Sequence, residues 1–263
     1  MNLLEIGDYR QSLMLLAIVM TRITTIMIIT PFLSSNVITG AGRNAVILSL
    51  TLVLFPLLIP AHLDIEIGTL DLTALLIKEG ILGTFIGFIS SLAFYITQSA
   101  GFFIDNQRGA TLASVFNPLF GEQTSPLGSA INVIITALFY VIGGFLAFLA
   151  IVYASYITWP IFSFYPTFDA RFPLYFLAVG DHFMRSTVLL AAPIVFVMFL
   201  SDFSLGLVNR FAPQLQVFFL SLPLKSGVSV LILIFYMSTF FELSKLEFSD
   251  SLIMIEFLNK LIS

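Results

Sequence analysis

The chain has no cysteine, which excludes disulfides, iron–sulfur clusters and zinc sites built on thiolates. It has only two histidines, His62 and His182, and they are far apart, which leaves little from which to build a histidine-based metal site. It also lacks G-x-S-x-G and other hydrolase motifs. We therefore expect no metal, no cofactor, no catalytic residue and no enzymatic activity.

Charge is scarce as well: 10% of the 263 residues are charged, and the 11 lysines and arginines are spread thinly. Because no basic patch is present to follow a phosphate backbone, we expect no nucleic-acid partner. The chain also lacks a polybasic cluster of the kind that binds lipid headgroups. What the chain has instead is 59% hydrophobic residues, 29 of its residues being phenylalanine, and a mean hydropathy of +1.05. This composition predicts a polytopic, all-α membrane protein.

The first apolar segment, residues 11–33, is long enough to span a bilayer as a helix. Glu5 and Asp8 precede it in place of the basic region of a secretory signal, so we expect the segment to be retained. Arg22 lies at its centre, where exposure to lipid is costly, and we expect it to point into a protein interface or a watered cavity. Pro31 is predicted to end the helix.

A turn is predicted over residues 34–44, followed by a short apolar helix at residues 45–60 that Pro56 interrupts. Residues 61–72 carry three carboxylates, Asp64, Glu66 and Asp71, and no lysine or arginine. Two of them, at positions i and i+2, could suggest acid–base catalysis, but they do not share a helix face and nothing nearby supplies a nucleophile. A solvated acidic loop is therefore the better interpretation.

Residues 72–104 predict one long helix, with Lys78 and Glu79 marking its solvated end. Gly83 and Gly87 have the GxxxG spacing that lets two helices approach closely in lipid. We therefore expect a tight helix contact there.

Residues 101–126, GFFIDNQRGATLASVFNPLFGEQTSP, form the longest polar interruption in the sequence. Their glycines and prolines disfavour a continuous helix. The stretch is either a solvated connection or irregular backbone that lines or blocks an aqueous path through a membrane assembly. Asp105 and Arg108 are either a charge pair or two solvated charges.

Residues 127–157 predict a further long apolar helix, in which Gly143 and Gly144 suit a close contact or a bend. The aromatic and proline-rich residues 159–173 are typical either of a membrane-interface belt or of aromatic packing under a loop. Both interpretations remain open from sequence alone.

Residues 174–209 predict a helix kinked at Pro193. Asp202 and Arg210 lie about two turns apart, so they can pair if the helix persists. A last apolar run leads into an amphipathic helical tail at residues 242–263.

The charges give no clear orientation by the positive-inside rule. Charge within a segment, a short second segment and several prolines also fit poorly with six independent lipid-facing spans. They fit better with helices that bury one another or bury against partner subunits. A secondary transporter also uses broken helices and intramembrane charge, but no convincing repeat relates two halves of this chain.

Five short runs carry a resemblance to a known family. They are TPFLSS at 30–35, GAGRNA at 40–45, IDNQRGA at 104–110, RFAPQ at 210–214 and LPLKSG at 222–227. In this order, and over nearly the whole chain, they resemble the T component of the type III secretion export apparatus. This is the SctT family, which includes SpaR, YscT and HrcT and is homologous to flagellar FliR. IDNQRGA and the KSG run resemble the injectisome branch more than the flagellar one.

The resemblance implies a non-enzymatic part of a protein-conducting pore, in the bacterial inner membrane at the core of the secretion basal body. The implied partners are R-type, S-type and U-type export apparatus subunits, unfolded proteins in transit and membrane lipid. The implied architecture is a set of helical hairpins in a pore-forming hetero-oligomer, with an R-like part at residues 1–180, an S-like hairpin at 181–241 and the tail at 242–263. In that family the assembled core lies largely above the plane of the membrane. This would explain why neither the positive-inside rule nor the segment lengths give a clear topology for this chain.

The family's plug loop corresponds to about residues 106–125, and Asp105 to Arg108 are expected to anchor it. The residues implied in plugging and gating are Asp105, Asn106, Gln107, Arg108, Gly109, Phe116, Asn117, Pro118 and Gly121. Those expected at assembly interfaces are Arg22, Gly83, Gly87, Asp202, Arg210, Pro213, Gln214 and Lys225. We expect alanine at Arg22, Arg210 or Lys225 to impair assembly rather than gating.

Overall fold

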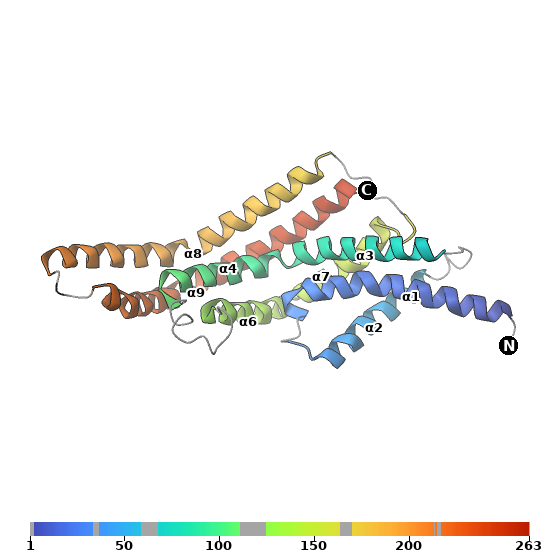
Figure 1. Cartoon of the computed structure of the whole chain (residues 1–263), viewed down its shortest axis with the longest axis horizontal. Coiled ribbons are helices and arrows are strands. Elements are labelled where there is room, and N and C mark those ends of the chain that lie inside the picture. The colour runs from blue at the N-terminus through green and yellow to red at the C-terminus, as the bar shows by residue number, and fades with distance from the viewer. Residues whose placement is uncertain are drawn as a thin grey trace. The chain divides into compact units, whose positions relative to one another are not determined.

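The structure, a computed structural model, describes residues 3–33, 37–58, 68–110, 125–163, 170–212, 214 and 217–262. Within these ranges every regular element is a helix, as expected from the composition (Figure 1). The helices are α1 (Leu3–Ile29), the 3-10 turn η1 (Pro31–Leu33), α2 (Gly40–Leu58), α3 (Thr69–Ser90), α4 (Leu92–Gln107), α6 (Pro126–Val141), α7 (Gly144–Thr158), α8 (Phe172–Phe211) and α9 (Val217–Ile262). Pro31 follows the end of α1, as predicted.

Among the described residues, four helical segments are long and apolar enough to cross a membrane. They are Gln11–Ile29, Thr69–Ser90, Phe172–Phe211 and Phe219–Leu258. The pair α6 and α7, broken at Gly143, counts as a fifth if it is taken as one span, whereas α2 is too short. The polytopic membrane class is thus confirmed, with helices that are partly buried against one another.

The first compact unit comprises Met1–Ser91, Gly143–Tyr175 and Asp250–Ser263. In it α1 packs along α3, and α2 packs against α1 (Figure 1). A Cβ atom added to Gly83 would lie 2.7 Å from the backbone oxygen of Arg22, and one added to Gly87 would lie 3.1 Å from that of Ile26. The tight contact predicted from the GxxxG spacing is therefore confirmed, and it joins two helices of the same chain.

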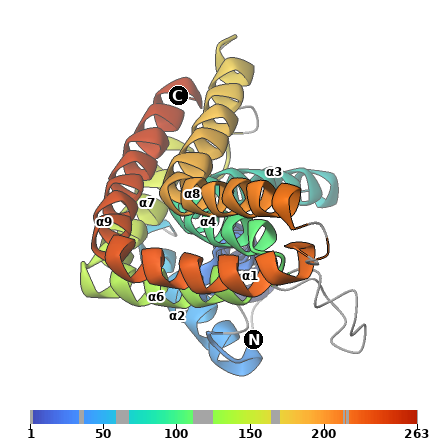
Figure 2. The same cartoon turned by 90° about the vertical axis from the view of Figure 1, so that its left-hand side faces the viewer.

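The second compact unit comprises Leu92–Ile142 and Phe176–Ser249. Its core is the contact of α4 with α6, which lie side by side in both views (Figure 1, Figure 2). Phe94, Phe139 and Phe248 close this core, with ring centroids 5.1 to 5.4 Å apart. Both units are discontinuous in sequence, and the division of the chain after residues 180 and 241 remains a prediction.

Two helices predicted to be continuous are broken. The helix expected over residues 72–104 ends at Ser90, and Ser91 separates α3 from α4. The Ser91 hydroxyl donates to the backbone oxygen of Gly87 at 2.7 Å, a side-chain bond of the kind that bends helices. The helix expected over residues 127–157 is interrupted at Gly143, whose φ of 77° lies in the left-handed region open to glycine. This is the bend alternative rather than a close contact.

The structure also differs from the prediction at the turn of residues 34–44, in the helix that follows it and at the end of the acidic loop. The turn predicted as far as residue 44 is wrong, because α2 already begins at Gly40. Pro56 does not interrupt that helix but lies in its last turn, where few backbone bonds remain to lose. Asp71 belongs to the first turn of α3, where a carboxylate favours the helix dipole. The rest of the acidic loop, with Asp64 and Glu66, lies outside the described residues.

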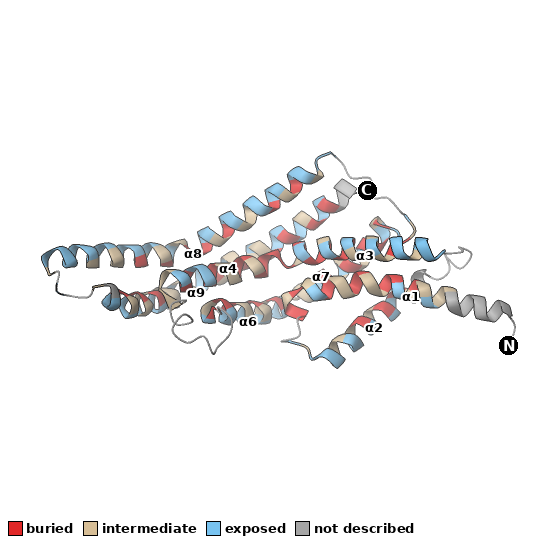
Figure 3. Ribbon diagram, in the orientation of Figure 1, coloured by how far each residue is buried: buried red, intermediate tan, exposed pale blue. Residues whose placement is uncertain are grey.

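α8 and α9 are antiparallel and joined by a hydrogen bond between His182 and Glu247 at 2.8 Å and by an ion pair between Asp202 and Lys225 at 3.1 Å. α8 bends in its middle, the region of Pro193, as predicted (Figure 1). The amphipathic tail is the C-terminal part of α9. α8 is mainly exposed in the isolated chain, whereas buried residues are most frequent on α1, α3 and α4 (Figure 3).

Candidate functional site

The polar residues that flank the predicted plug loop meet at the contact of α4 with α6. Asp105, near the end of α4, is fully buried. Its Oδ2 accepts a hydrogen bond from the Ser125 hydroxyl at 2.6 Å and another from the backbone N–H of Leu127 at 2.9 Å. Its Oδ1 lies 2.7 Å from Nη2 of Arg108. Of the two sequence-based alternatives, the charge pair is the one observed.

Ser125 also begins α6. Its hydroxyl oxygen accepts from the backbone N–H of Gly128 at 2.9 Å, and Pro126 occupies the first helical position, where its missing N–H is no loss. With Leu127 donating to Asp105, every N–H in the first turn of α6 up to Gly128 has an acceptor. One of these acceptors comes from α4, so the start of α6 depends on a residue 22 positions earlier.

The end of α4 is equally well defined. Gly109 has a φ of 81°, the left-handed conformation that commonly follows a helix, and its N–H donates to the backbone oxygen of Asn106 at 3.1 Å. Asn106 is exposed, while Gln107 and Arg108 are half-buried. Phe116, Asn117, Pro118 and Gly121, also predicted for the plug, lie outside the described residues.

Arg22 is fully buried at the centre of α1, where its guanidinium meets two other helices. Nε and Nη2 donate to the two carboxylate oxygens of Glu79 on α3, the second at 3.0 Å. Nη1 donates to the backbone oxygen of Ser155 at 2.9 Å and to its hydroxyl at 3.1 Å, and Nη2 donates to the backbone oxygen of Trp159 at 2.9 Å. All five N–H groups are therefore satisfied, and the predicted interface lies within the chain.

Lys78 extends this network. Its ammonium lies 3.0 Å from a carboxylate oxygen of Glu79, and it donates to the backbone oxygens of Pro160 and Ser163, each at 3.1 Å, and of Ile161. Arg22 and Lys78 thus cover carbonyls at and beyond the C-terminal end of α7, where the helix dipole favours cations.

The sequence-based interpretation missed this role for Lys78 and Glu79. They do not mark a solvated end of the helix, since Glu79 is fully buried and the Lys78 side chain is 10% exposed. A signal was present, because a buried Arg22 requires a counter-ion and Glu79 is the only acidic residue in residues 72–104.

The aromatic residues beside this network belong to the core. Trp159 and Tyr156 are both buried, so the interface-belt interpretation is wrong for these two and the packing alternative applies. The Tyr156 ring lies under the Arg22 guanidinium at 4.1 Å, and its hydroxyl donates to the backbone oxygen of Val19 at 2.9 Å.

The pairing of Asp202 with Arg210 predicted from α8 is wrong. Asp202 pairs instead with Lys225 across the α8–α9 hairpin, because the antiparallel partner approaches Asp202 more closely than a residue two turns along the same helix. Arg210 and Gln214 are exposed at the tip of the hairpin, and Pro213 lies outside the described residues.

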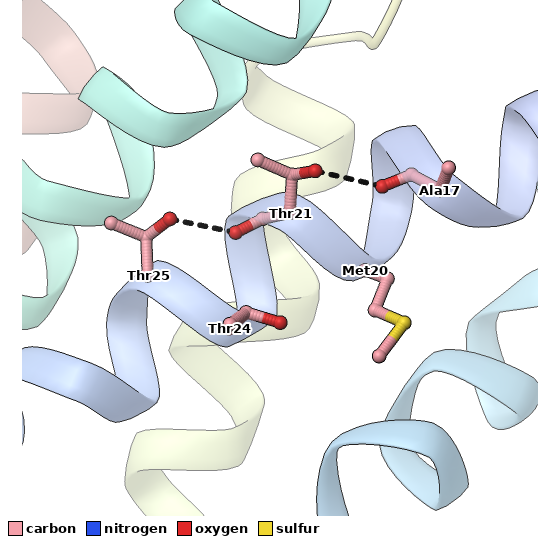
Figure 4. A pocket seen from close by; sticks show the side chains of 5 residues that line it. All are labelled: Ala17, Met20, Thr21, Thr24 and Thr25. Atoms are coloured by element: carbon pink, nitrogen blue, oxygen red, sulfur yellow. Dashed lines mark hydrogen bonds between the residues drawn. The ribbon is translucent and has the colours of Figure 1, made fainter. Parts of the chain in front are cut away.

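A pocket of about 310 Å³ opens along α1, lined by Ala17, Met20, Thr21, Thr24 and Thr25 (Figure 4). The hydroxyl of Thr21 donates to the backbone oxygen of Ala17 at 2.8 Å, and that of Thr25 to the oxygen of Thr21 at 2.7 Å. No ionisable side chain is among these lining residues, so the pocket offers no acid–base or metal chemistry.

Residues 13–251 match the family described as bacterial export proteins, family 1. The chain belongs to this family. The match covers all the described helices except the ends of α1 and α9, and therefore includes both polar networks.

Individual relatives are of two kinds. The chain is 36% identical over 228 residues to Yop proteins translocation protein T of Yersinia pestis, covering 86% of this chain and 87% of the relative. It is 34% identical over 221 residues to Surface presentation of antigens protein SpaR of Salmonella typhimurium, covering 82% and 80%. The flagellar biosynthetic protein FliR of Bacillus subtilis is 33% identical over 173 residues, covering only 65% and 67%.

These relatives confirm the resemblance stated from the short runs, and the greater coverage favours the injectisome branch over the flagellar one. The chain is a homologue of the T component of the type III secretion export apparatus, a multi-pass membrane protein of a bacterial export apparatus. The family is one of export proteins, not of enzymes.

Proposed function

We propose that this chain is a core subunit of the export gate, forming with R-type and S-type subunits the inner-membrane pore through which unfolded proteins are secreted. A U-type subunit packs against it, and membrane lipid contacts the rest of its surface. The observation that carries the proposal is membership of the export family over residues 13–251. Residues 1–180 form the R-like part of the subunit and residues 181–241 the S-like hairpin.

The α8–α9 hairpin supplies part of the subunit interface in this proposal. Phe196, Phe199 and Phe203 each expose more than half of their surface in the isolated chain. Aromatic side chains of this size are suited to anchoring in partner helices. Lys225 and Asp202 stabilise the hairpin from within, and Arg210, Pro213 and Gln214 at its tip take part in assembly.

The loop of residues 106–125 acts as the plug of the resting pore. Support comes from its two ends, since Asp105, which pairs with Arg108 at the end of α4, accepts hydrogen bonds from Ser125 and Leu127 at the start of α6. The two ends are therefore held side by side, as expected of a segment that starts and ends at one place on the subunit.

Deletion of residues 110–122 tests the plug. The two held ends lie outside the deletion, so we expect the complex to assemble and to be recovered at the wild-type level. The open path should then raise entry of a membrane-impermeant dye across the inner membrane of secretion-competent cells. Assembled complexes that admit no more dye than the wild type would rule out a gating role for this loop.

A further inference from the structure

Side chains of α8 and α9 bring together one imidazole and two carboxylates. Nε2 of His182 on α8 lies 2.8 Å from a carboxylate oxygen of Glu247 on α9. Asp250 follows Glu247 by three residues on the same helix, so the two carboxylates lie one turn apart on one face. One ligand atom from each of the three residues lies within 4.8 Å of the other two. We propose that His182, Glu247 and Asp250 bind one divalent cation of the zinc class.

The charges around these residues favour a cation. In the part of the chain that the structure describes, no lysine or arginine forms an ion pair with Glu247 or Asp250. Lys245, the basic residue nearest to them along α9, pairs with Glu242 at 2.8 Å, and Arg185 of α8 is exposed. Two carboxylates held close together repel each other unless a positive charge lies between them, and a bound divalent cation supplies that charge.

The chemistry of the ligands selects the metal. Zn²⁺ binds imidazole nitrogen and carboxylate oxygen at about 2.0 to 2.2 Å, whereas Mg²⁺ and Ca²⁺ are bound by oxygen ligands. Three protein ligands leave a fourth position for water. Ligand atoms around a tetrahedral Zn²⁺ lie about 3.4 Å apart. His182 and Glu247 must therefore give up their direct hydrogen bond and move slightly apart to admit the ion.

The three residues can be reached from water. The side chains of His182 and Glu247 are 24% and 13% exposed, and Asp250 is exposed. With 46 residues, α9 is about 70 Å long, more than twice the thickness of the hydrocarbon core of a bilayer. Its charged residues are concentrated from Glu242 onward, so this is the part of α9 that lies outside the hydrocarbon. An ion can therefore enter past Asp250.

A bound cation joins α8 to α9 at the open end of their hairpin. Asp202 and Lys225 already join the two helices nearer to its tip. The cation stabilises the folded chain because only folding brings His182 to Glu247, which is 65 positions away. The same distance explains why the sequence alone does not indicate the site, since a single histidine has no second ligand near it in the chain.

Zinc binding by the full chain tests the proposal. The protein carries an affinity tag without histidine, is purified in mild detergent and is freed of metal with a chelator. Zn²⁺ alone is titrated in competition with a fluorescent zinc indicator, and thermal unfolding is followed with and without Zn²⁺. The ligand variants are His182→Ala, Glu247→Ala and Asp250→Ala. Asp181→Ala is the matched control, an exposed carboxylate of α8, and His62→Ala removes the other histidine of the chain.

We expect the wild type to bind one Zn²⁺ per chain, and about a thousandfold excess of Mg²⁺ not to displace it. At about 100 times its dissociation constant, Zn²⁺ should raise the unfolding midpoint by about 5 °C or more. Each ligand variant should weaken Zn²⁺ binding by about tenfold or more. Asp181→Ala and His62→Ala should bind Zn²⁺ as the wild type does.

Asp250→Ala decides the matter where another ligand variant fails to fold, because this exposed carboxylate forms no hydrogen bond or ion pair with the described residues. A wild type that binds no Zn²⁺, or an Asp250→Ala variant that binds it equally well, would overturn the site. Loss of binding with His62→Ala would place the ion elsewhere. Displacement by Mg²⁺ would show that the imidazole is not a ligand, and the proposal would fall with it.

Discussion

Replacing Arg22 with alanine is expected to abolish or strongly reduce recovery of the assembled complex. The substitution leaves the carboxylate of Glu79 buried with only Lys78 beside it, and it removes the donors that hold Ser155 and Trp159. Breaking a buried ion pair by removing one partner costs about 3–5 kcal/mol, a large share of the stability of a typical domain. The measurement is the yield of full-length protein and of complex from solubilised membranes.

Two comparisons locate this effect in the buried pair. Arg185→Ala removes an exposed arginine of α8 and should leave the yield unchanged. Arg22→Met combined with Glu79→Gln removes both charges, so no uncompensated carboxylate remains buried. This double variant should therefore restore part of the yield of complex that Arg22→Ala loses. Wild-type recovery of the complex with Arg22→Ala would show that the network does not support the fold.

Replacing Gly83 with alanine is the second change expected to have a large effect. Its new methyl group would lie 2.7 Å from the backbone oxygen of Arg22 and 3.0 Å from Cβ of Thr25, so α1 and α3 must separate. Overpacking of this kind costs about 1–3 kcal/mol, and the separation would also strain the pairing of Arg22 with Glu79. We expect a lower thermal midpoint in detergent, measured by size-exclusion chromatography after heating.

Gly80 provides the control on the same helix. A Cβ atom there meets nothing closer than the Thr25 hydroxyl at 4.0 Å, and alanine is the better helix former. Gly80→Ala should therefore leave the midpoint unchanged or raise it slightly. If Gly80→Ala and Gly83→Ala lowered the thermal midpoint equally, the close approach of α1 and α3 would not be what limits stability.

The sequence predicted features that have a local cause. The apolar runs predict membrane-type helices because their length and hydropathy suffice, and Pro31 follows the end of α1 because proline cannot continue a helix. The GxxxG spacing predicts the contact of α3 with α1 because small residues are what close packing in lipid requires. The cost of burying charge likewise predicts that Arg22 faces protein.

Features set by distant residues were predicted poorly. The sequence predicts that Glu79 is solvated because it lies beside Lys78. Only the fold brings Glu79 to Arg22, which is 57 positions away. Asp202 has two basic candidates, and antiparallel packing selects Lys225 on α9 over Arg210 on its own helix. The groups that donate to Asp105 from the start of α6 lie beyond a long polar stretch, so the sequence suggests an anchor at Asp105 and Arg108 but gives no reason to add Ser125. The break at Ser91 also escapes prediction, because serine is common inside membrane helices, whereas at Gly143 the sequence left open both a bend and a close contact.

The two networks make separable predictions. Arg22, Lys78 and Glu79 tie together α1, α3 and the end of α7, so their loss should act on folding and therefore on assembly. Asp105 and Ser125 tie together α4 and α6 at the two ends of the loop that we propose as the plug, so their loss should act on sealing. Variants of the first kind should lower the amount of complex, and variants of the second kind should raise leakage per complex.

Co-purification of the affinity-tagged full chain from mild detergent, with R-type and S-type subunits co-expressed, is the most direct test of a role in the export gate. We predict one stable complex that contains all three kinds of subunit and that Arg22→Ala depletes. A monodisperse monomer that takes up solute or cleaves protein would contradict the assignment.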